Sequence, residues 1–540
     1  MLIPQDFPSF ESSSTRTLSP INFHLAENNS PSDLLQFLRN KFTSKKIETR
    51  QSTFHRWDTF DWRLNKNNLL LFQSKNKLCL LSKEATPPYP SPPPMFLKSC
   101  LKGATNKHLI KDPNLQNLIA SHLSNRSLLD QVQYNQQSSL HSIFNKDMKT
   151  VAFMLYHRIY CESKYTEEKP SLSWVQLFPF RGYTEALNKI KIYFSPLLKS
   201  ELKNPFDWAQ LFLPISLRKN LNYNNRLRLH LDSNLDADQA LIKIFNQCTK
   251  TIHLNTEGIV ADLDVEFLHD YRVATRRVRS GISFAKKLFD RDALESAKTD
   301  MRMLGNATNK LRDIDVYLQR EIKIKKSLPP EMSDALNPFF CELRKERILE
   351  QRKLKNFLKS NVYYEIIDRW ELFLKENEFP DNPITNKISE KVGSIANKQI
   401  LKALSKLMTE GYKINRDSPD EMLHELRIHG KKLRYLMEFY SSLYLENQVE
   451  SFINNLKTLQ KCLGKFNDRS MQQLKLNEYI KKLCIDKESI PLATAMGILI
   501  GNLQMDKVTL KCEFFTHFEN FCSKNNLLNA KALFDYQPNS

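Results

Sequence analysis

The chain has 540 residues and carries 80 Lys+Arg against 60 Asp+Glu, which gives a formal net charge of +20. This length allows two or three domains, and this charge favours a polyanionic partner such as nucleic acid, an acidic membrane face or a phosphate polymer. With 11 glycines and neither G-x-x-x-x-G-K-[ST] nor G-x-G-x-x-G, the sequence excludes the common glycine-rich phosphate loops.

The spacing of the cysteines and the lengths of the apolar segments indicate in which cellular compartment the protein is expected. The nine cysteines are scattered singly, without C-x-x-C or the spacing of zinc ligands, and are typical of small core residues in a reducing environment. The N-terminus lacks a basic segment followed by an apolar one, and no run approaches the roughly 18 apolar residues of a membrane span. We therefore expect a cytoplasmic protein that is not inserted into a membrane.

The first part of the chain has a mixed texture. Residues 1–31 are rich in serine, asparagine and proline and predict a tail. Residues 32–228 predict an α+β domain. Its expected elements are a helix at 33–42, strands near 69–72, 78–81, 150–160 and 174–180, helical structure within 97–129, and a helix that opens at 181. The proline-rich segment 86–94 cannot lie inside a helix or a central strand, so we predict a linker or loop.

From residue 236 the chain changes to long stretches of helical periodicity with few breakers. We predict an all-α domain over 229–525, followed by a tail at 526–540. The expected helices lie near 236–254, 264–289, 294–307, 311–325, 331–358, 361–376, 385–413, 419–442, 447–463, 467–483, 490–501 and 505–524.

An eleven-residue pattern occurs twice in this helical region. The segments 269–279 (HDYRVATRRVR) and 424–434 (HELRIHGKKLR) both follow H-[DE]-x-R-x-x-x-[RK]-[RK]-x-R, with an offset of 155 residues. The same offset relates Asp313 to Asp468, which we expect at helix starts, as caps or as partners of neighbouring guanidiniums. A register kept over this distance indicates an internal duplication. Two helical bundles related by a pseudo-twofold axis are therefore expected.

On a helix, the cations of each copy gather on one edge. At 100° per residue the positions of the first copy span an arc of about 80°, away from an apolar stripe that includes Tyr271. The edge consists of His269, Arg272, Arg276 and Arg279 in the first copy and of His424, Arg427, Lys431 and Arg434 in the second. Arg277 and Lys432 lie off the edge, a position that predicts a role on another surface. We expect the cations of both edges to lack a neutralising acid three or four residues away, so an anion should offset their repulsion.

Other basic residues extend this set. Arg302 and Arg312 share a face of the helix after the first motif, and Lys457 corresponds to Arg302 in the second copy. Lys398 and Lys402 begin another cationic edge at i, i+4 spacing. These residues are the further candidates for anion binding.

The motifs resemble the signature of the CHAD family, whose name denotes a conserved-histidine α-helical domain. The similarity covers roughly residues 230–525 and rests on both basic motifs, on 312–316 (RDIDV) and on 463–468 (LGKFND). It implies two pseudo-symmetric helical bundles around a basic groove or pore that binds inorganic polyphosphate. The binding positions that it implies are His269, Arg272, Arg276, Arg279, Arg302, Arg312, His424, Arg427, Lys431, Lys432, Arg434 and Lys457, with Lys398 and Lys402 as further candidates. Thr308 and Asn309 depart from the Leu-Gly usual in the family.

The N-terminal region resembles the CYTH domain, which is often fused ahead of CHAD. The similarity rests on 57–64 (WDTFDWRL), on the leucines at 69–71 and on 181–183 (RGY). CYTH triphosphatases need E-x-E-x-K, whose carboxylates hold the catalytic metal, but this chain offers only 47–50 (IETR). The resemblance therefore implies a degenerate domain without catalysis, and we expect no cofactor. A triphosphatase or polyphosphatase with rearranged acids remains an alternative.

A metal ion and nucleic acid are two further possible ligands of the helical region. His269 and His424 each lack a metal-binding residue three or four positions later, and a cationic edge disfavours a dication, so we expect phosphate donors or core histidines instead. Nucleic-acid binding calls for aromatic side chains between the cations, whereas Tyr271, Phe289 and Tyr440 fall on the core side. We therefore predict a non-catalytic polyphosphate-binding protein, cytoplasmic and with polyphosphate granules as one location, and keep nucleic acid as the less favoured partner.

Overall fold

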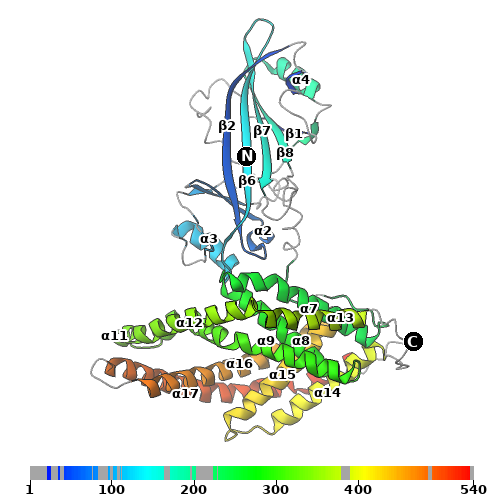
Figure 1. The fold of residues 1–540 in the computed structure, drawn as a ribbon, viewed down its shortest axis with the longest axis vertical. Coiled ribbons are helices and arrows are strands. Elements are labelled where there is room, and N and C mark those ends of the chain that lie inside the picture. The colour runs from blue at the N-terminus through cyan, green and yellow to red at the C-terminus, as the bar shows by residue number, and fades with distance from the viewer. Residues whose placement is uncertain are drawn as a thin grey trace. The chain divides into compact units, whose positions relative to one another are not determined.

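The computed structural model divides into two compact units, Met1–Asn224 and Asn225–Ser540, which are described separately (Figure 1). No helix among the described residues is both long enough and apolar enough to cross a membrane. The structure describes residues 21–25, 34–36, 42–75, 77–82, 95–97, 101, 103–105, 110, 112–162, 171–194, 198–201, 223–227, 229–378, 390–483 and 489–534.

Within these residues, the N-terminal unit is built on one curled antiparallel sheet with the strand order β5-β4-β3-β2-β6-β7-β8-β1-β9. The strands are β1 (Ile21–Leu25), β2 (Thr43–Asp58), β3 (Leu69–Ser74), β4 (Lys77–Ser82), β5 (Met95–Leu97), β6 (Leu129–Phe144), β7 (Thr150–Glu162), β8 (Ser171–Pro179) and β9 (Leu198–Glu201). The helices of this unit are α2 (Arg63–Lys66), α3 (Pro113–Leu123) and α4 (Thr184–Phe194).

One face of the sheet packs against α4. Met154 of β7 and Val175 and Leu177 of β8 are buried in one cluster with Ile190 and Phe194 of α4. Because successive side chains of a strand point to opposite faces, the residues between these apolar positions belong to the other face. Burial of the apolar side chains against α4 therefore determines which side chains of each strand lie on the face away from α4.

That other face carries neutral polar side chains. Ser138 of β6 lies opposite His157 of β7, and its hydroxyl is 2.8 Å from His157 Nδ1. His157 Nε2 is 3.0 Å from Gln176 Oε1, and the imidazole stacks on Trp174. Burial lowers the pKa of His157 to about 4, so this histidine is uncharged near neutral pH.

The sequence predicted part of this sheet. Strands near 69–72, 78–81, 150–160 and 174–180 are confirmed as β3, β4, β7 and β8, and the helix expected from 181 begins at Thr184 as α4. The strands β2 and β6 were missed. In β6 the buried positions include Gln136, Ser138 and Ser142, so the strand lacks the alternation of apolar and polar residues that marks a half-buried strand.

The predictions nearest the N-terminus differ from the structure. The segment 1–31 was expected to be a tail, but β1 lies within it and pairs with β8 and β9. Of the helix predicted at 33–42, residues 34–36 are helical, 37–41 lie outside the described residues and Phe42 is not helical. The proline-rich linker predicted at 86–94 also lies outside the described residues.

The described part of the C-terminal unit is helical. Its helices are α7 (Ala237–Val260), α8 (Val265–Phe284), α9 (Arg291–Gln319), α10 (Glu321–Lys325), α11 (Pro330–Ser333), α12 (Asn337–Leu358), α13 (Asn361–Glu378), α14 (Val392–Tyr412), α15 (Asp420–Tyr440), α16 (Glu446–Lys482), α17 (Ile490–Phe521) and α18 (Lys524–Phe534), with short 3-10 helices η3 (Asp334–Leu336) and η4 (Ser441–Leu443). The first-copy motif lies on α8 and packs against α7 and α9. The second-copy motif lies on α15 and packs against α14 and α16.

Helix α8 shows how the sequence orients the motif. Asp264 caps its N-terminus, because its carboxylate accepts hydrogen bonds from the backbone N–H groups of Glu266 and Phe267 at 2.9 and 3.3 Å. Tyr271 and Val278, on the predicted apolar stripe, are fully buried. Burial of this stripe turns the opposite, cationic edge of the helix away from the core.

Three predicted helix breaks do not exist. The predicted pair 294–307 and 311–325 is the long helix α9 followed by α10. The pairs 447–463 and 467–483, and 490–501 and 505–524, are the single helices α16 and α17. The glycines near these breaks, such as Gly464 and Gly501, cost a helix only about 1 kcal/mol relative to alanine, which tertiary packing readily offsets. Thr308 stays helical and directs its hydroxyl to the carbonyl of Gly305 at 2.8 Å.

The end of the chain also differs from expectation. Residues 526–540 were expected to be a tail, but α18 continues to Phe534, and Ala530 and Phe534 are buried. The Phe534 ring contacts Tyr444 and Phe452, which belong to the second half of the helical unit. This apolar packing holds the helix against the bundle.

Candidate functional site

The cationic edge of α8 contacts the neighbouring helix α9. One guanidinium nitrogen of Arg272 donates hydrogen bonds to Thr308 Oγ1 at 2.8 Å, to Asn309 Oδ1 at 2.7 Å and to the carbonyl of Gly305 at 3.3 Å. All three acceptors are neutral. They hold the side chain in place without cancelling its charge. Burial, followed by the charge of Arg276, lowers the pKa of Arg272 to about 10.

His269 lies at the start of this edge and contacts Arg312 of α9. The Arg312 Nη2 group donates to His269 Nδ1 at 3.2 Å, so the histidine accepts at Nδ1 and carries its proton on Nε2. Burial, and then the charge of Arg312, lower the pKa of His269, which favours this neutral form. In the second copy, His424 Nδ1 contacts Asn467 Oδ1, and Asn467 is the counterpart of Arg312. The two histidines thus make equivalent contacts with different partners.

The edge of α15 repeats the arrangement with one exception. Arg434 donates to Gln460 Oε1 of α16 at 3.2 Å, and its counterpart Arg279 likewise has a nitrogen close to Gly305, the counterpart of Gln460. However, Arg434 also pairs with Glu438 at 3.1 Å, four residues later on the same helix. The expectation that both edges lack an acid at this spacing is therefore wrong for Arg434.

The two cationic edges meet at Arg276. Its charge reaches the other cations of the first copy, and α8 contacts α15 directly. Burial lowers the pKa of Arg427, and the charge of Arg276 acts in the same direction. Burial, then the charges of Arg427 and Arg276, lower the pKa of Lys431 to about 7. One arginine is therefore within Coulomb range of the cations of both copies.

Two acids border this cationic cluster. Asp313 and Asp468 were expected at helix starts, but they lie inside α9 and α16, so they are not caps. Asp468 accepts a hydrogen bond from Arg320 at 2.7 Å, which agrees with the expected role of orienting a guanidinium. Burial raises the pKa of Asp313, while the charges of Arg272 and Arg312 oppose the rise.

Other predicted site residues lie at the margin of the cluster or apart from it. Arg302 is exposed on α9. Burial is the main cause of the lowered pKa of Arg279, and the charge of Arg302 acts in the same direction, so Arg302 adjoins the first edge. Lys457 is exposed and donates to Asn454 of its own helix at 3.3 Å. Lys398 pairs with Glu390 at 2.8 Å, and Lys402 is exposed on the same helix, α14.

Lys432 lies on a different side of α15 from Lys431. The pKa of His429 is lowered, mainly by burial. The charges of Lys432 and of Lys406 of α14 act in the same direction. On a helix Lys432 is rotated by 100° from Lys431, and its side chain is exposed. The structure thus separates Lys432, predicted as a binding residue, from the cluster around Arg276.

Arg277 has the separate role that its position off the edge suggested. It is 7% exposed and donates to Glu438 of α15 at 2.9 Å and to the backbone carbonyl of Asn225. The Arg277–Glu438 pair therefore joins the helices that carry the two motifs. The adjacent residues Arg276 and Arg277 differ in partner and in burial.

One group of acids was missed. Glu266 and Asp270 lie close to His269, with one potential metal-ligand atom of each within 4.8 Å of the others. The signal was present in the sequence, because Glu266 precedes His269 by three residues and so shares its helix face. Asp270 accepts a hydrogen bond from Asn225 at 2.7 Å, and the cationic Arg312 touches the imidazole. These contacts make the group a poor place for a metal ion.

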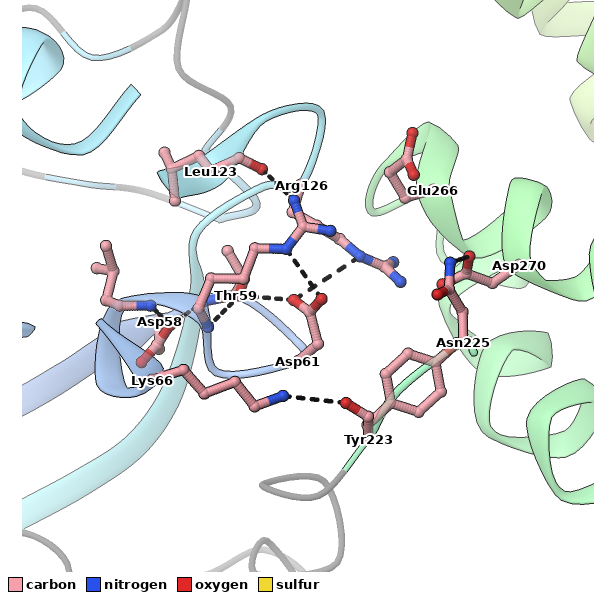
Figure 2. Close-up of polar contacts among 12 residues, drawn as sticks. Asp58, Thr59, Asp61, Lys66, Leu123, Arg126, Tyr223, Asn225, Glu266 and Asp270 are labelled. Atoms are coloured by element: carbon pink, nitrogen blue, oxygen red, sulfur yellow. Dashed lines mark hydrogen bonds and ion pairs between the residues drawn. The ribbon is translucent and has the colours of Figure 1, made fainter. Parts of the chain in front are cut away.

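In the N-terminal unit, the two aspartates of the WDTFDWRL segment have structural partners (Figure 2). Asp58 is fully buried and accepts from the backbone N–H groups of Thr59, Leu64 and Asn65 at 2.7 to 2.9 Å. Burial raises its pKa to about 6. Asp58 therefore caps the turn that leads into α2.

Asp61 faces a hydroxyl and two guanidiniums. It accepts from Thr59 Oγ1 at 2.8 Å and from Arg63 at 2.9 Å, and it lies 3.9 Å from Arg126 (Figure 2). These positive neighbours and hydrogen bonds hold the pKa of Asp61 below its usual value although burial, the largest single influence, acts the other way. Both aspartates thus organise the segment between β2 and β3.

A comparison with known protein families matches part of the helical unit. Residues 243–477 match the family model of the CHAD domain. These residues form a CHAD domain. The match includes both basic motifs on α8 and α15, all of α9 and most of α16, so the cluster around Arg276 lies inside the CHAD domain.

The chain also resembles solved structures, among them the following two. The CHAD domain from the plant Ricinus communis is 20% identical with a TM-score of 0.47, and the match covers 55% of this chain and 97% of that one. PptA from Streptomyces chartreusis is 14% identical with a TM-score of 0.39, and the match covers 53% of this chain and 100% of that one. No curated protein sequence matches the chain.

Proposed function

We propose that the CHAD domain binds inorganic polyphosphate, without catalysis, on the surface formed by the cationic edges of α8 and α15. The observation that carries the proposal is the position of Arg276, whose charge acts on the cations of both motif copies. Positive groups crowded in this way repel one another in the ligand-free protein. A chain of phosphates would relieve that repulsion along the whole surface.

The chemistry of the cluster favours phosphate. Arginine presents a planar fork of N–H donors that matches phosphate oxygens, and Arg272 is already positioned by neutral acceptors. A single exposed ion pair contributes only about 0.2–1 kcal/mol, but several adjacent cations act together, and release of counterions strengthens binding at low salt. The aromatic residues Tyr271 and Tyr440 are fully buried and Phe289 nearly so, which leaves no stacking platform for bases on these positions.

We infer that the two halves of the helical unit are related by a pseudo-twofold axis. In a twofold arrangement, residues near the axis contact their own counterparts. Tyr317 donates to the carbonyl of Gln472 at 2.9 Å, and Lys391 pairs with Asp236 at 2.8 Å; both contacts join residues that are 155 positions apart. This number equals the offset of the duplicated motif.

A reciprocal contact supports the same inference. Arg320 pairs with Asp468 at 2.7 Å. The counterparts of these residues are Lys475 and Asp313, and the charge of Lys475 acts on Asp313, although burial dominates the raised pKa of that carboxyl. An attraction between the corresponding charges thus acts on both sides of the inferred axis, although Lys475 forms its ion pair with Glu346.

The N-terminal unit is proposed to be a degenerate CYTH-like domain without catalytic activity. Glu48, in the IETR segment, pairs with Arg50, and Asp58 and Asp61 are committed to backbone groups and arginines. Metal-assisted hydrolysis needs carboxylates that converge on an ion and the phosphates. The buried polar face instead presents neutral groups such as Ser138 and His157.

A binding experiment on the full chain tests the function. Purified protein is titrated with long-chain polyphosphate, tripolyphosphate and single-stranded RNA at matched phosphate concentration, with and without magnesium. We expect polyphosphate to displace RNA, and Arg276→Gln to weaken polyphosphate binding about fivefold to thirtyfold, the loss of roughly 1–2 kcal/mol. Lys345→Gln, which changes an exposed lysine on α12 outside the candidate residues, is the control and should leave binding unchanged.

The other outcomes decide between the alternatives. If polyphosphate fails to displace RNA, the domain is a nucleic-acid binder and the proposal is wrong. If the protein releases phosphate from tripolyphosphate only with magnesium, and a chelator stops the release, the N-terminal unit is a triphosphatase. Neither result is expected from the contacts of Asp58 and Asp61 and the burial of the aromatic residues.

A further inference from the structure

A second group of potential ligands lies between α16 and α17. It consists of Cys462 on α16 and of Glu513 and His517 on α17, with one ligand atom of each residue within 4.8 Å of the others. Helices α16 and α17 run side by side in the helical unit (Figure 1). Glu513 and His517 are four residues apart, so they occupy the same face of α17, one turn from each other.

The chemistry of this group fits a transition metal of the zinc type. A cysteine sulfur, an imidazole nitrogen and a carboxylate oxygen are all zinc ligands, and the sulfur makes the set unsuitable for magnesium or calcium. Cys462 is buried, His517 is half-buried and Glu513 is exposed, so the group opens to solvent on one side. We propose that Cys462, Glu513 and His517 form a binding site for Zn²⁺ or a similar divalent transition metal, with water as the remaining ligand.

The backbone that carries these residues is held in place without a metal. Cys462 Sγ donates to the carbonyl of Leu510 at 3.4 Å, and Leu510 lies on the same face of α17 as the two other ligands. The neighbouring Phe514 and Phe518 are buried and stack on each other with ring centroids 5.5 Å apart. The site therefore needs only rotation of side chains, which keeps the cost of binding low.

This group differs from the one around His269 in its surroundings. Arg312 contacts His269, and Asp270 accepts a hydrogen bond from Asn225. The group on α16 and α17 instead contains the carboxylate of Glu513, and no contact of this group with an arginine is recorded within the described residues. Lys465 lies nearby, one turn along α16, and its charge acts on Cys462. A single lysine on a flexible stem can move away from a bound dication.

The metal site is independent of the proposed polyphosphate surface. On α16, Gln460 and Asn467 face α15, and each is rotated by about 140–160° from Cys462 around the helix. Loss of polyphosphate binding would leave this proposal standing, and the reverse also holds.

Cobalt substitution tests the site directly. Reduced, metal-free full-chain protein is titrated with Co²⁺, because a thiolate bound to Co²⁺ gives a sulfur-to-metal charge-transfer band. We expect such a band, saturating at one Co²⁺ per chain and removed by stoichiometric Zn²⁺. Cys462→Ser should abolish the band, and Glu513→Gln or His517→Gln should weaken metal affinity at least about tenfold.

The controls separate this site from other thiols. Cys512 is exposed and is rotated around α17 by about 100° from Glu513 and about 140° from His517, so Cys512→Ser should leave the band intact. Glu513 and His517 are not buried, and circular dichroism should show that their variants keep their helical content. Zinc should also raise the thermal midpoint of the wild type and of Cys512→Ser by more than it raises that of His517→Gln. Absence of the band, or a band that survives in Cys462→Ser, overturns the proposal.

Discussion

Arg272 is bound to Thr308, whose hydroxyl accepts a hydrogen bond from the guanidinium at 2.8 Å. Asn309 adds a second neutral acceptor at 2.7 Å. At the counterpart positions of the second copy stand Leu463 and Gly464, which have no side-chain acceptor. The two copies of the motif therefore hold equivalent arginines in different ways.

This difference predicts the effect of making the first copy like the second. The double change Thr308→Leu and Asn309→Gly removes two acceptors and leaves Arg272 to order itself on binding. We expect polyphosphate affinity to fall about threefold to tenfold, roughly 1 kcal/mol, because the side chain is no longer positioned in advance. Isothermal titration measures the change, with circular dichroism to verify the fold. Unaltered affinity would mean that positioning of Arg272 is unimportant.

The depressed pKa of Lys431 predicts that binding depends on pH. With a pKa of about 7 in the free protein, Lys431 is largely neutral at pH 8, and a bound phosphate chain raises that pKa. Polyphosphate affinity should therefore fall as pH rises from 6 to 8.5, and binding near neutral pH should take up protons. Titration in buffers of different ionisation enthalpy measures this uptake.

Lys431→Arg provides the matched comparison, because arginine keeps its charge over this range. Its affinity should depend much less on pH than that of the wild type. Lys432→Arg, one residue along on another side of α15, should keep the wild-type dependence. An identical pH profile in Lys431→Arg would rule out this lysine as the titrating group.

The same pKa shift predicts the stability of the free protein. The pKa of Lys431 is about 7 in the folded state and near 10.5 in the unfolded state, so the unfolded chain binds more protons between these pH values. Lys431 therefore lowers the free energy of unfolding, and this destabilisation is complete below pH 7 and lost as the pH rises toward 10.5. Lys431→Met should therefore raise the free energy of unfolding at pH 7, by about 1–2 kcal/mol after allowance for solvent screening. Urea denaturation at pH 7 and pH 10 checks this. The gain should shrink at the higher pH.

Adjacent arginines of α8 should behave differently when replaced. Arg277→Ala removes one of the two arginine partners of the half-buried Glu438 and breaks the link to α15, so it should lower the free energy of unfolding by about 2 kcal/mol. Arg276→Ala should leave stability equal or higher, because it removes repulsion, and should weaken polyphosphate binding. Thermal unfolding and binding are measured on both variants. Equal effects on both quantities would contradict the separate roles assigned here.

Salt dependence gives a count of the charges involved. The slope of log affinity against log salt concentration reflects the number of phosphates neutralised. Arg276→Gln should reduce the magnitude of this slope by about one, and Lys345→Gln, at an exposed position on α12, should not alter it. A greater loss of slope in Lys345→Gln than in Arg276→Gln would place the binding surface on α12 instead.

Periodicity predicted the orientation of the motif helices well. The stripe containing Tyr271 and Val278 is buried, and the cationic edge of α8 turns away from it, as a period of 3.6 residues requires. The pattern also placed Arg277 off the edge, where it meets Glu438. The sequence could not show that Arg276 joins both edges, since that depends on the packing of α8 against α15.

Other features needed tertiary information. Asp313 was assigned to a helix start because a break was expected nearby, but α9 continues through it, since packing offsets the low helix propensity of Thr308 and Asn309. The strand β6 was missed because its buried face is built from glutamine and serine that bond to His157 and to each other. Lys398 and Lys402 shared a helix edge in sequence, yet Lys398 has an acid partner, Glu390, that lies eight residues away.

The unequal surroundings of Arg272 and Lys431 have a consequence for a uniform ligand. Polyphosphate has identical repeating units, so any asymmetry in its complex must come from the protein. A chain lying across both copies would meet a permanently charged, fixed group on α8 and a group on α15 whose charge follows the acidity of the medium. A fall in pH would thus strengthen binding at the half of the surface on α15, and a rise in pH would weaken it, while the half on α8 would continue to bind the chain.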